Sequence, residues 1–540
     1  MVKLNRALSG LLVAVALVAA CRDPLMVQNY NNPQRTQVYA RPGDVEALIY
    51  GSYRSMSNGT FGVDGIGPSA RAMSWENASN LNNWGMGPRS AVPRTFIDNG
   101  RGNLYLNENL TEFNSQQRAA RAAADGLNRL YAGLSLGSAS QDARAKAFGW
   151  FVIGCGLTNV GLAYDSAAIP SPFDDLSYIP PLSSYTDVVA AALVAFDSAL
   201  ANTANATASF PLPTAWLNGN TTTQAQFREL IYSWKARARA DVARDPTERA
   251  AVNWTEVHND AARGLSADFR ITVGGGSGWT AQTNNQWYLF QQWTQVNQLI
   301  AGMADVSGSY ETWLRAWPNG TPFVVLTPDL RWPQGASRAA QQAASPAVPT
   351  GRLYFRNRTG ADSPADPWSS FYDWYRMKAW ADANYTGPYP VFVKAQNDLL
   401  LAEAHLRLPT PDIAEAARLI DLTRVPNGLP ALVGQVATLN DPVPGGGSCV
   451  PRVPTRATSP RATVCGNIME AMKWEYRMET MYLSWISQYF ASRGWGDLPE
   501  GTPIHWPVPY QEMDARRHPF YNMGGVGRTG GAVGVGTYGF

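Results

Sequence analysis

Apolar residues recur at helical spacing over much of the chain, and the clearest pattern runs from residue 396 to residue 430. Leu399, Ala402 and Leu406 place an apolar face on a first helix, which Pro409 prevents from continuing. A second helix is predicted directly afterwards, with Thr410 as its N-cap. The pattern predicts a tight antiparallel helix pair of the tetratricopeptide (TPR) type. The apolar face of the second helix consists of Ile413, Ala416, Ala417 and Ile420.

Helical periodicity also fills most of the N-terminal half of the chain. Between residues 270 and 390 it fades, Gly, Pro and Trp accumulate, and short β-capable runs occur at 322–326 and 352–355. The predicted fold is therefore mainly α, with TPR-like helix pairs forming a scaffold and a loop-rich insert that contains short β segments. Further helices are predicted over 44–56, 116–167 with a break near 133–140, 185–201, 226–243, 253–264 and 466–493.

The first 20 residues have the composition of a bacterial export signal. Lys3 and Arg6 precede an apolar run of signal-peptide length, which is too short for a membrane span. Small residues precede Cys21, as at a lipoprotein processing site, so Cys21 is the expected lipid attachment point. The alternative is an ordinary cleaved signal in which this cysteine is incidental. No later segment has eighteen consecutive apolar residues, so no further membrane span is expected.

These patterns divide the chain into a signal peptide and four further segments. The segment after the signal is polar and is broken by Pro and Gly, as expected for a tether. The expected organisation is a signal peptide at 1–20, a lipidated tether at 21–43, an N-terminal TPR-like helical scaffold at 44–269, a loop-rich ligand-binding insert at 270–390, and a C-terminal region at 391–540 with the TPR-like pair, a long helix and a Gly-rich tail.

Composition narrows the possible function classes. Charged residues make up only 16% of the chain and the net charge is +2, which argues against nucleic acid as a partner, because such proteins concentrate basic residues on one face. Aromatic residues reach 11%, with 19 Trp and 23 Tyr. These values are typical of an exported globular protein with much uncharged polar surface.

The four cysteines have separate expected roles. Cys155 lies in an apolar helical context and is predicted to be a buried thiol. Cys449 and Cys465 bracket a loop rich in Pro, Arg, Ser and Thr, and in an oxidising envelope they are expected to form a disulfide. The four histidines are scattered and no Cys/His group has ligand spacing, so neither a metal nor another cofactor is predicted.

Three motifs that suggest an enzyme lack the context that catalysis requires. Residues 133–137 spell G-x-S-x-G, but a helix precedes them where a nucleophile elbow needs a strand. Residues 525–530 and 534–539 spell G-x-G-x-x-G, but neither opens a helix in a βαβ unit. The acidic pair at 174–175 fits loop solvation better than glycoside chemistry. The chain is therefore expected to bind rather than to catalyse.

Short sequence motifs along the chain together suggest one protein family. They are Gly51 and Tyr53 in the first helix, ARARADVARD at 236–245 with Trp254, Arg424 with Gly428-Leu429-Pro430, Glu475, Arg477 and Glu479, and Pro507-Val508-Pro509 with Glu512. In this order they resemble the SusD/RagB-like outer-membrane nutrient-binding lipoproteins, and the chain is identified as a divergent member. Departures occur at Asp421, where Asn is common in the family, and at 480–484, where the family's Gly and Arg are missing.

The resemblance implies a protein on the cell surface, anchored to the bacterial outer membrane, that captures oligosaccharide for a SusC-like TonB-dependent transporter. A sugar offers C–H faces and hydroxyls, so aromatic plates beside amide donors are the expected binding groups. A peptide-capturing member of the family and a structural surface or filament protein remain as alternatives. The candidate ligand-binding residues are Trp75, Asn77, Asn83 and Trp84 in one loop, and Trp279, Asn284, Asn285 and Trp287 in the insert.

Overall fold

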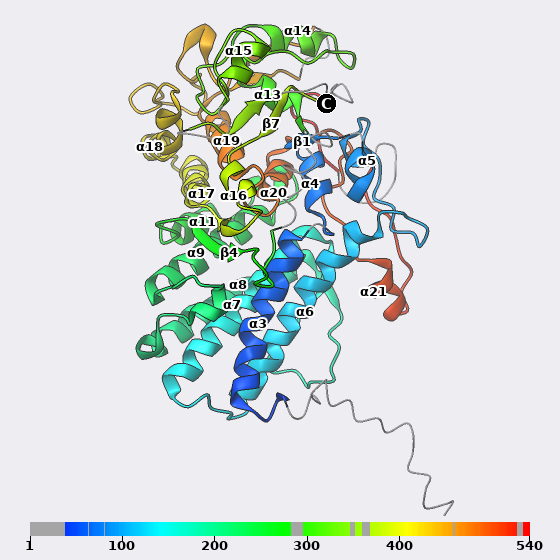
Figure 1. Cartoon of the computed structure of the whole chain (residues 1–540), viewed down its shortest axis with the longest axis vertical. Coiled ribbons are helices and arrows are strands. Elements are labelled where there is room, and N and C mark those ends of the chain that lie inside the picture. Colours follow the sequence, from blue (N-terminus) through cyan, green and yellow to red (C-terminus); the bar gives the residue numbers. More distant parts are fainter. Residues whose placement is uncertain are drawn as a thin grey trace, which may run out of the picture.

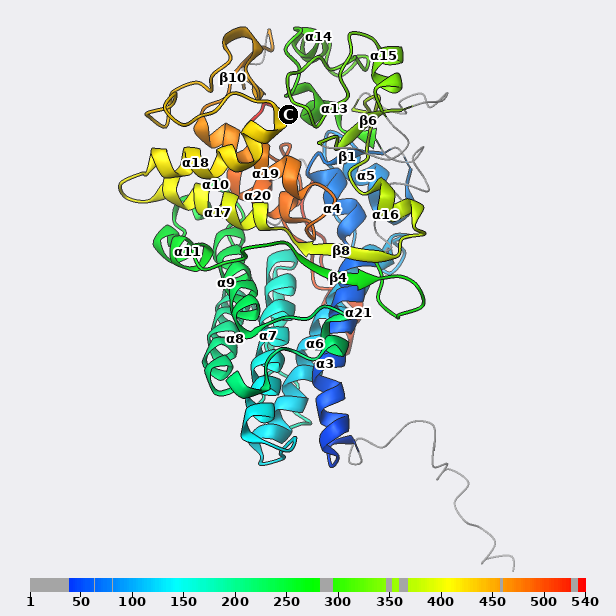
Figure 2. The same ribbon diagram turned by 60° about the vertical axis from the view of Figure 1, so that its left-hand side comes forward.

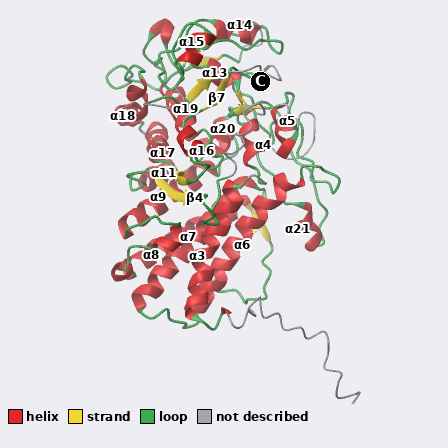
Figure 3. Ribbon diagram, viewed as in Figure 1, coloured by secondary structure: helices red, strands yellow, loops and turns green. Residues whose placement is uncertain are grey.

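A computed structural model of the chain describes residues 38–62, 64–79, 81–281, 295–345, 352–358, 368–456, 460–525 and 533–540. The expected signal peptide, the lipidation site Cys21 and most of the tether lie outside the described residues. Figure 1 shows long helices forming the lower half of the molecule and shorter elements forming the upper half. Figure 3 shows that strands occur only as short pieces among these helices and loops. The mainly α fold class is therefore confirmed.

The N-terminal scaffold consists mainly of long helices that pack against one another. Helices α3, α6, α7 and α8 lie side by side in Figures 1 and 2. The central helix, α7, is buried along most of its length, so its apolar composition reflects the core. Helices α7 and α8 are apolar and long enough to cross a membrane. The share of their apolar 18-residue stretch that is buried inside the fold is 89% for α7 and 39% for α8. The scaffold helices are α3 (Pro42–Phe61), α6 (Leu106–Tyr131), α7 (Ala139–Ala163), α8 (Tyr185–Asn205), α9 (Gln224–Asp241) and α11 (Trp254–Ala261).

Local sequence explains why these helices begin and pack where they do. Thr223 and Gln226 form a capping box at the start of α9. The Ser138 side chain accepts a hydrogen bond from the Gln141 backbone N–H and caps α7. Gly154 lets α7 approach α8, because a Cβ at that position would lie 2.6 Å from the ring of Phe196. Capping and close approach together fix the scaffold.

The predicted helix pair is present as α17 (Lys394–Arg407) and α18 (Ile413–Arg424). Its N-cap differs from the prediction, because Asp412 rather than Thr410 accepts the hydrogen bond from the backbone N–H of Glu415, at 3.0 Å. The pair ends at Gly428, which adopts a left-handed conformation with φ of 84°. The Arg424 Nε donates to the Pro430 carbonyl at 2.8 Å and fixes the chain that follows.

Strands occur as five two-stranded antiparallel pairs in the described part of the chain. The run predicted at 322–326 is not a strand, and the run predicted at 352–355 reaches a strand only at Phe355. The pairs are β1 (Asn77–Ala78) with β5 (Gln295–Val296), β2 (Ser166–Ala168) with β3 (Leu182–Ser184), β4 (Phe269–Val273) with β8 (Gly387–Phe392), β6 (Phe355–Asn357) with β7 (Tyr372–Trp374), and β9 (Arg452–Pro454) with β10 (Thr463–Cys465).

The single long helix predicted over 466–493 is wrong. The structure has α19 (Ile468–Thr480) and α20 (Ser487–Trp495), separated by a turn in which Tyr482 and Ile486 have positive φ. Tyr482 donates hydrogen bonds to Glu76 from its backbone N–H and its hydroxyl, both at 2.9 Å. These contacts with a residue more than 400 positions away offset the strain of the turn. The remaining short helices are α4 (Gly67–Met73), α5 (Met86–Ser90), α10 (Pro246–Ala250), α13 (Gln298–Gly302), α14 (Ser309–Arg315), α15 (Arg338–Ala343), α16 (Lys378–Asp382) and α21 (Tyr510–Ala515).

Helix α19 holds both the insert and the C-terminal tail through buried charges. Glu475 accepts two hydrogen bonds from the guanidinium of Arg331 in the insert, at 2.8 and 3.1 Å. Arg477 pairs with Asp497 and contacts the hydroxyl of Tyr538 in the tail. All five side chains are buried, so each pair is shielded from water. Two of these residues, Glu475 and Arg477, belong to the family phrase identified in the sequence.

Candidate functional site

The first predicted tryptophan lies inside the protein. Trp75 is 2% exposed, with its ring centroid 5.0 Å from that of Trp368 and the Arg94 guanidinium 5.0 Å from its centre. Asn77 is 0% exposed and belongs to strand β1. Neither residue has an open face for a ligand, so their expected role as a surface platform is wrong. Burial of large apolar area stabilises the fold here instead.

Trp84 and Asn83 are the members of that loop which reach the surface. Asn83 is exposed and Trp84 is partly exposed. The Trp84 Nε1 donates to Asp64 Oδ1 at 3.1 Å, and the backbone of Trp84 is left-handed with φ of 51°. A non-glycine residue in this conformation is uncommon and often marks a functional constraint. These two residues remain candidates for ligand contact.

The second predicted group is only partly within the described residues. Trp279 is 6% exposed, and its ring centroid is 6.0 Å from that of Tyr53 in α3. It therefore packs the insert onto the scaffold and offers no open ring face, which corrects the expectation for this residue. Asn284, Asn285 and Trp287 lie outside the described residues.

The structure reveals a cavity in the insert that the sequence analysis did not identify. It measures about 340 Å³, within the range of small-ligand sites. Helix α14 and the loops on either side of it form its walls, and no lining side chain is charged. A neutral ligand rich in hydroxyl groups suits such a wall. The lining residues are Ser307, Gly308, Ser309, Thr312, Trp313, Ala316, Gly320, Thr321 and Phe323.

The wall of this insert cavity combines hydroxyls with aromatic edges. The Ser307 hydroxyl donates to Asp305 and its oxygen accepts from the Ser309 backbone N–H at 3.2 Å. The Thr312 hydroxyl donates to the Gly308 carbonyl at 3.2 Å, so the Thr312 oxygen can still accept a hydrogen bond. The Trp313 Nε1 has no hydrogen-bond partner within the described chain. A Cβ on Gly320 would lie 2.5 Å from the Trp313 ring, so only glycine allows this close approach.

An aromatic cluster adjoins the insert cavity behind Trp313. The ring centroid of Trp317 lies 5.4 Å from that of Trp313 and 5.2 Å from that of Phe540, the last residue of the chain. Trp317 and Phe540 are partly exposed, and the Arg461 guanidinium lies 4.3 Å from the centre of the Phe540 ring. The pairing of β1 with β5 brings the loop around Trp75 to the same cluster. The two predicted regions therefore do meet, although mainly through buried rings.

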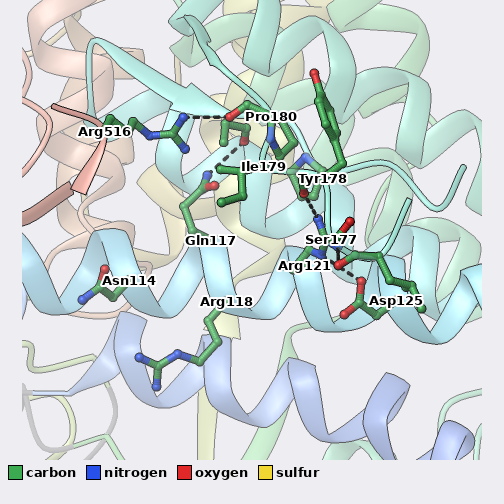
Figure 4. A pocket seen from close by; sticks show the side chains of 13 residues that line it. Asn114, Gln117, Arg118, Arg121, Asp125, Ser177, Tyr178, Ile179, Pro180 and Arg516 are labelled. Carbon is green, nitrogen blue, oxygen red and sulfur yellow. Dashed lines mark hydrogen bonds and ion pairs between the residues drawn. The ribbon is translucent and has the colours of Figure 1, made fainter. Parts of the chain in front are cut away.

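A larger cavity, of about 490 Å³, lies on the scaffold beside α6 (Figure 4). Its arginines mostly hold the neighbouring loop. Arg121 donates to the carbonyls of Leu176 and Tyr178, at 2.6 and 2.8 Å, and Arg516 donates to the Pro180 carbonyl at 2.8 Å. These guanidinium groups position residues 176–180 on the helix, as the dashed lines in Figure 4 show. The insert cavity is therefore the better candidate for a ligand.

The structure shows where three of the four cysteines lie and whether acidic, His and Cys side chains gather in the described residues. Cys449 and Cys465 form a disulfide in the structure, between chain segments that are also joined by the β9–β10 pair. Cys155 is a free, buried thiol whose pKa is raised by burial. Within the described ranges no group of three or more His, Cys, Asp or Glu residues is arranged to hold a metal ion.

Comparison with known proteins relates this fold to solved structures. No family model matches the chain, and no curated protein matches it. A SusD superfamily protein from Bacteroides thetaiotaomicron is 12% identical, with a TM-score of 0.52, over 88% of this chain and 96% of that protein. A SusD superfamily protein from Bacteroides fragilis is 13% identical, with a TM-score of 0.51, over 88% and 98%. A SusD-like protein from Bacteroides fragilis is 13% identical, with a TM-score of 0.50, over 91% and 98%. The chain therefore has the SusD-like fold, although only 12–13% of its residues are identical to those of these proteins.

Proposed function

We propose that this protein is an outer-membrane lipoprotein that binds nutrients and does not catalyse a reaction. It captures oligosaccharide and delivers it to a SusC-like TonB-dependent transporter. The observation that carries the proposal is the SusD-like fold, which covers 88% of this chain and 96% of one solved relative. The predicted export signal at 1–20, which Cys21 follows, and the low charge of the chain support this role.

The insert cavity and the aromatic cluster beside it are the proposed oligosaccharide site. Sugar hydroxyls would exchange hydrogen bonds with the serine and threonine hydroxyls of the wall, and a sugar C–H face would stack on Trp317. The uncharged wall favours neutral sugars over charged ones. Trp84 and Asn83 are proposed as a second contact, because they place a partly exposed ring next to an exposed amide in the sequence.

The binding site can be tested by substituting Trp317 and comparing affinities. Trp317→Ala should weaken binding of an oligosaccharide about tenfold, because one lost stacking ring costs on the order of 1–2 kcal/mol. Trp150→Ala is the matched control, since Trp150 is also partly exposed but lies on α7, in the scaffold. Trp84→Ala tests the second contact in the same titration. Equal affinity of the Trp317 variant and the control would remove the cluster from the site.

The ligand class can be tested with a panel of neutral oligosaccharides and peptides in isothermal titration calorimetry. Saturable heat with an oligosaccharide alone would support the proposal. Saturable heat with a peptide alone would replace it by peptide capture. Concentration-dependent assembly without any ligand heat would favour the structural surface protein instead.

Anchoring and the transporter partner need separate experiments in cells. Cys21→Ala should release the protein from the membrane fraction and remove the acyl mass from its N-terminal peptide. Unchanged fractionation of this variant would contradict lipidation at Cys21. Affinity purification of the anchored protein from detergent-solubilised outer membranes should recover a TonB-dependent transporter. Recovery of the protein alone would contradict the partnership.

A further inference from the structure

The sequence contains five Asn-Gly pairs, and all five lie within the described residues. Asparagine is chemically labile, and a following glycine exposes it most, because glycine has no Cβ to shield its backbone nitrogen or to restrict its rotation. The nitrogen of the glycine can then attack the Cγ atom of the asparagine. This attack requires an amide and an N–H that hydrogen bonds do not hold in place. The pairs are Asn58-Gly59, Asn99-Gly100, Asn218-Gly219, Asn319-Gly320 and Asn427-Gly428.

Hydrogen bonds hold four of the five pairs. Asn58 lies inside α3, where its amide donates to the Gly278 carbonyl at 2.8 Å and accepts from the Thr280 N–H at 3.0 Å. In three other pairs both the asparagine amide and the following glycine N–H donate to oxygen atoms. Attack by the glycine nitrogen would require these bonds to break first. The amides of Asn99, Asn218 and Asn427 donate to the carbonyls of Val508, Thr272 and Thr423, and the N–H groups of Gly100, Gly219 and Gly428 donate to Asp98 Oδ1 and to the carbonyls of Thr214 and Val425.

The pair Asn319-Gly320 differs from the other four. Asn319 is exposed, and within the described residues neither its side-chain amide nor the Gly320 N–H takes part in a hydrogen bond. The backbone N–H of Asn319 donates to the Ala316 carbonyl at 2.8 Å, in the turn that follows α14. Gly320 and Thr321 line the insert cavity. Both reacting groups are therefore available at this pair, on the rim of that cavity.

We propose that Asn319 is a site of spontaneous deamidation in this protein. The Gly320 nitrogen loses its proton to water and forms a bond with the Cγ atom of Asn319, the Cγ–Nδ2 bond breaks, and ammonia leaves. The resulting five-membered succinimide ring takes up one water molecule, which opens it to aspartate or to isoaspartate. The overall change converts an amide and water into a carboxylate and ammonium, so water is the only co-reactant.

Deamidation at this position changes the insert cavity in two ways. No side chain that lines the cavity is charged, and both products bring a carboxylate next to Gly320. Isoaspartate also adds one carbon atom to the main chain between residues 319 and 320. Space is limited there, because a Cβ on Gly320 would lie 2.5 Å from the Trp313 ring. Since this cavity is the proposed oligosaccharide site, the modification would also alter the surface that meets a sugar.

Peptide mapping of the intact protein after incubation at mildly alkaline pH tests the modification itself. Trypsin cleaves after Arg315 and Arg331, and the peptide between them contains Asn319 and no other asparagine or glutamine. This peptide should gain the mass that separates an OH group from an NH2 group, and it should resolve into aspartate and isoaspartate forms. The reaction should be at least about tenfold faster than at the other four pairs, because their hydrogen bonds must break first. Its rate should rise with pH, since the attacking nitrogen must lose its proton.

Two controls separate the effect of the fold from that of the local sequence. Protein digested without incubation gives the background, and Asn319→Gln should leave the peptide unchanged, because glutamine would have to form a six-membered ring. In urea-unfolded protein all five pairs should react at similar rates. Equal rates in the folded protein, or no change in the Asn319 peptide, would overturn the proposal. The same preference for Asn319 in unfolded protein would also overturn it, because the local sequence would then account for the selectivity.

Amide hydrogen exchange of the incubated protein tests the effect on the cavity. Peptides that cover residues 316–331 should exchange several times faster in the incubated native protein than in fresh protein, because the longer main chain displaces Gly320 from Trp313. Incubated Asn319→Gln should exchange like its fresh counterpart. Unchanged exchange in fully modified native protein would refute the effect on the cavity. Both measurements use no ligand, so their outcome is independent of whether the protein captures oligosaccharide.

Discussion

Glu112 should make the native protein less stable as pH rises, and Glu112→Gln should remove this dependence. The side chain lies on α6, is 0% exposed and has no cation beside it among the described residues. Its Oε1 accepts a hydrogen bond from Gln116 at 2.6 Å, and its Oε2 has no partner within the described chain. Burial raises the pKa of Glu112 from 4.5 to about 8, although the Gln116 hydrogen bond opposes this.

The size of the effect follows from the two pKa values. In the unfolded chain Glu112 ionises near 4.5, whereas in the folded protein it stays protonated up to about pH 8. A pKa raised by folding means that the folded state loses stability as pH rises from 4.5 to 8, with no further loss above 8. At about 1.4 kcal/mol per pH unit the full loss approaches about 5 kcal/mol. The loss is about 3 kcal/mol at pH 7.

Urea unfolding of both proteins between pH 4 and pH 9 provides the assay. The free energy of unfolding of Glu112→Gln minus that of the native protein should be near zero at pH 4 and should rise by several kcal/mol by pH 9. Glu500→Gln is the control, because the Glu500 side chain is exposed. A difference for Glu112→Gln that stays constant with pH would refute the reasoning.

Three further predictions concern the buried contacts that hold the fold together. Burial opposes ionisation of Glu403, yet two hydrogen bonds from the Arg249 guanidinium help to lower its pKa from 4.5 to about 2. The stability that this carboxylate contributes above pH 4.5 should therefore be lost as pH falls toward 2. Between pH 5 and pH 2.5, urea unfolding should show a loss of stability that is about 2 kcal/mol larger in the native protein than in Glu403→Gln. Arg331→Met should lower the free energy of unfolding by about 3–5 kcal/mol and speed proteolysis within the insert, and unchanged proteolysis would contradict the role of this arginine. Replacing both Cys449 and Cys465 by serine should cost about 3 kcal/mol in thermal unfolding, because their disulfide closes a loop of 16 residues.

Patterns that are local in sequence were sufficient to predict several of the helices and the turns between them. The helix pair α17–α18 follows from apolar spacing, from Pro409 and from Gly428, all within 35 residues. The break between α6 and α7 likewise lies where helical spacing fails in the sequence. The long C-terminal helix was mispredicted, and the turn that interrupts it contacts Glu76 through Tyr482, from a residue more than 400 positions earlier in the sequence. Spacing alone could not indicate that contact.

Whether a tryptophan is exposed depends on the residues that cover it, and these can come from anywhere in the chain. Trp75 is covered by Trp368 and by Phe540, which follow it by hundreds of residues. The asparagines around Trp75 suggest a polar surface loop from the sequence. One of them, Asn77, is instead buried as part of the short strand β1. Trp317 carries no sequence signal that separates it from its buried neighbour Trp313. Tryptophan density therefore located the region of the candidate site, while the three-dimensional packing of the insert decided which rings remain available to a ligand.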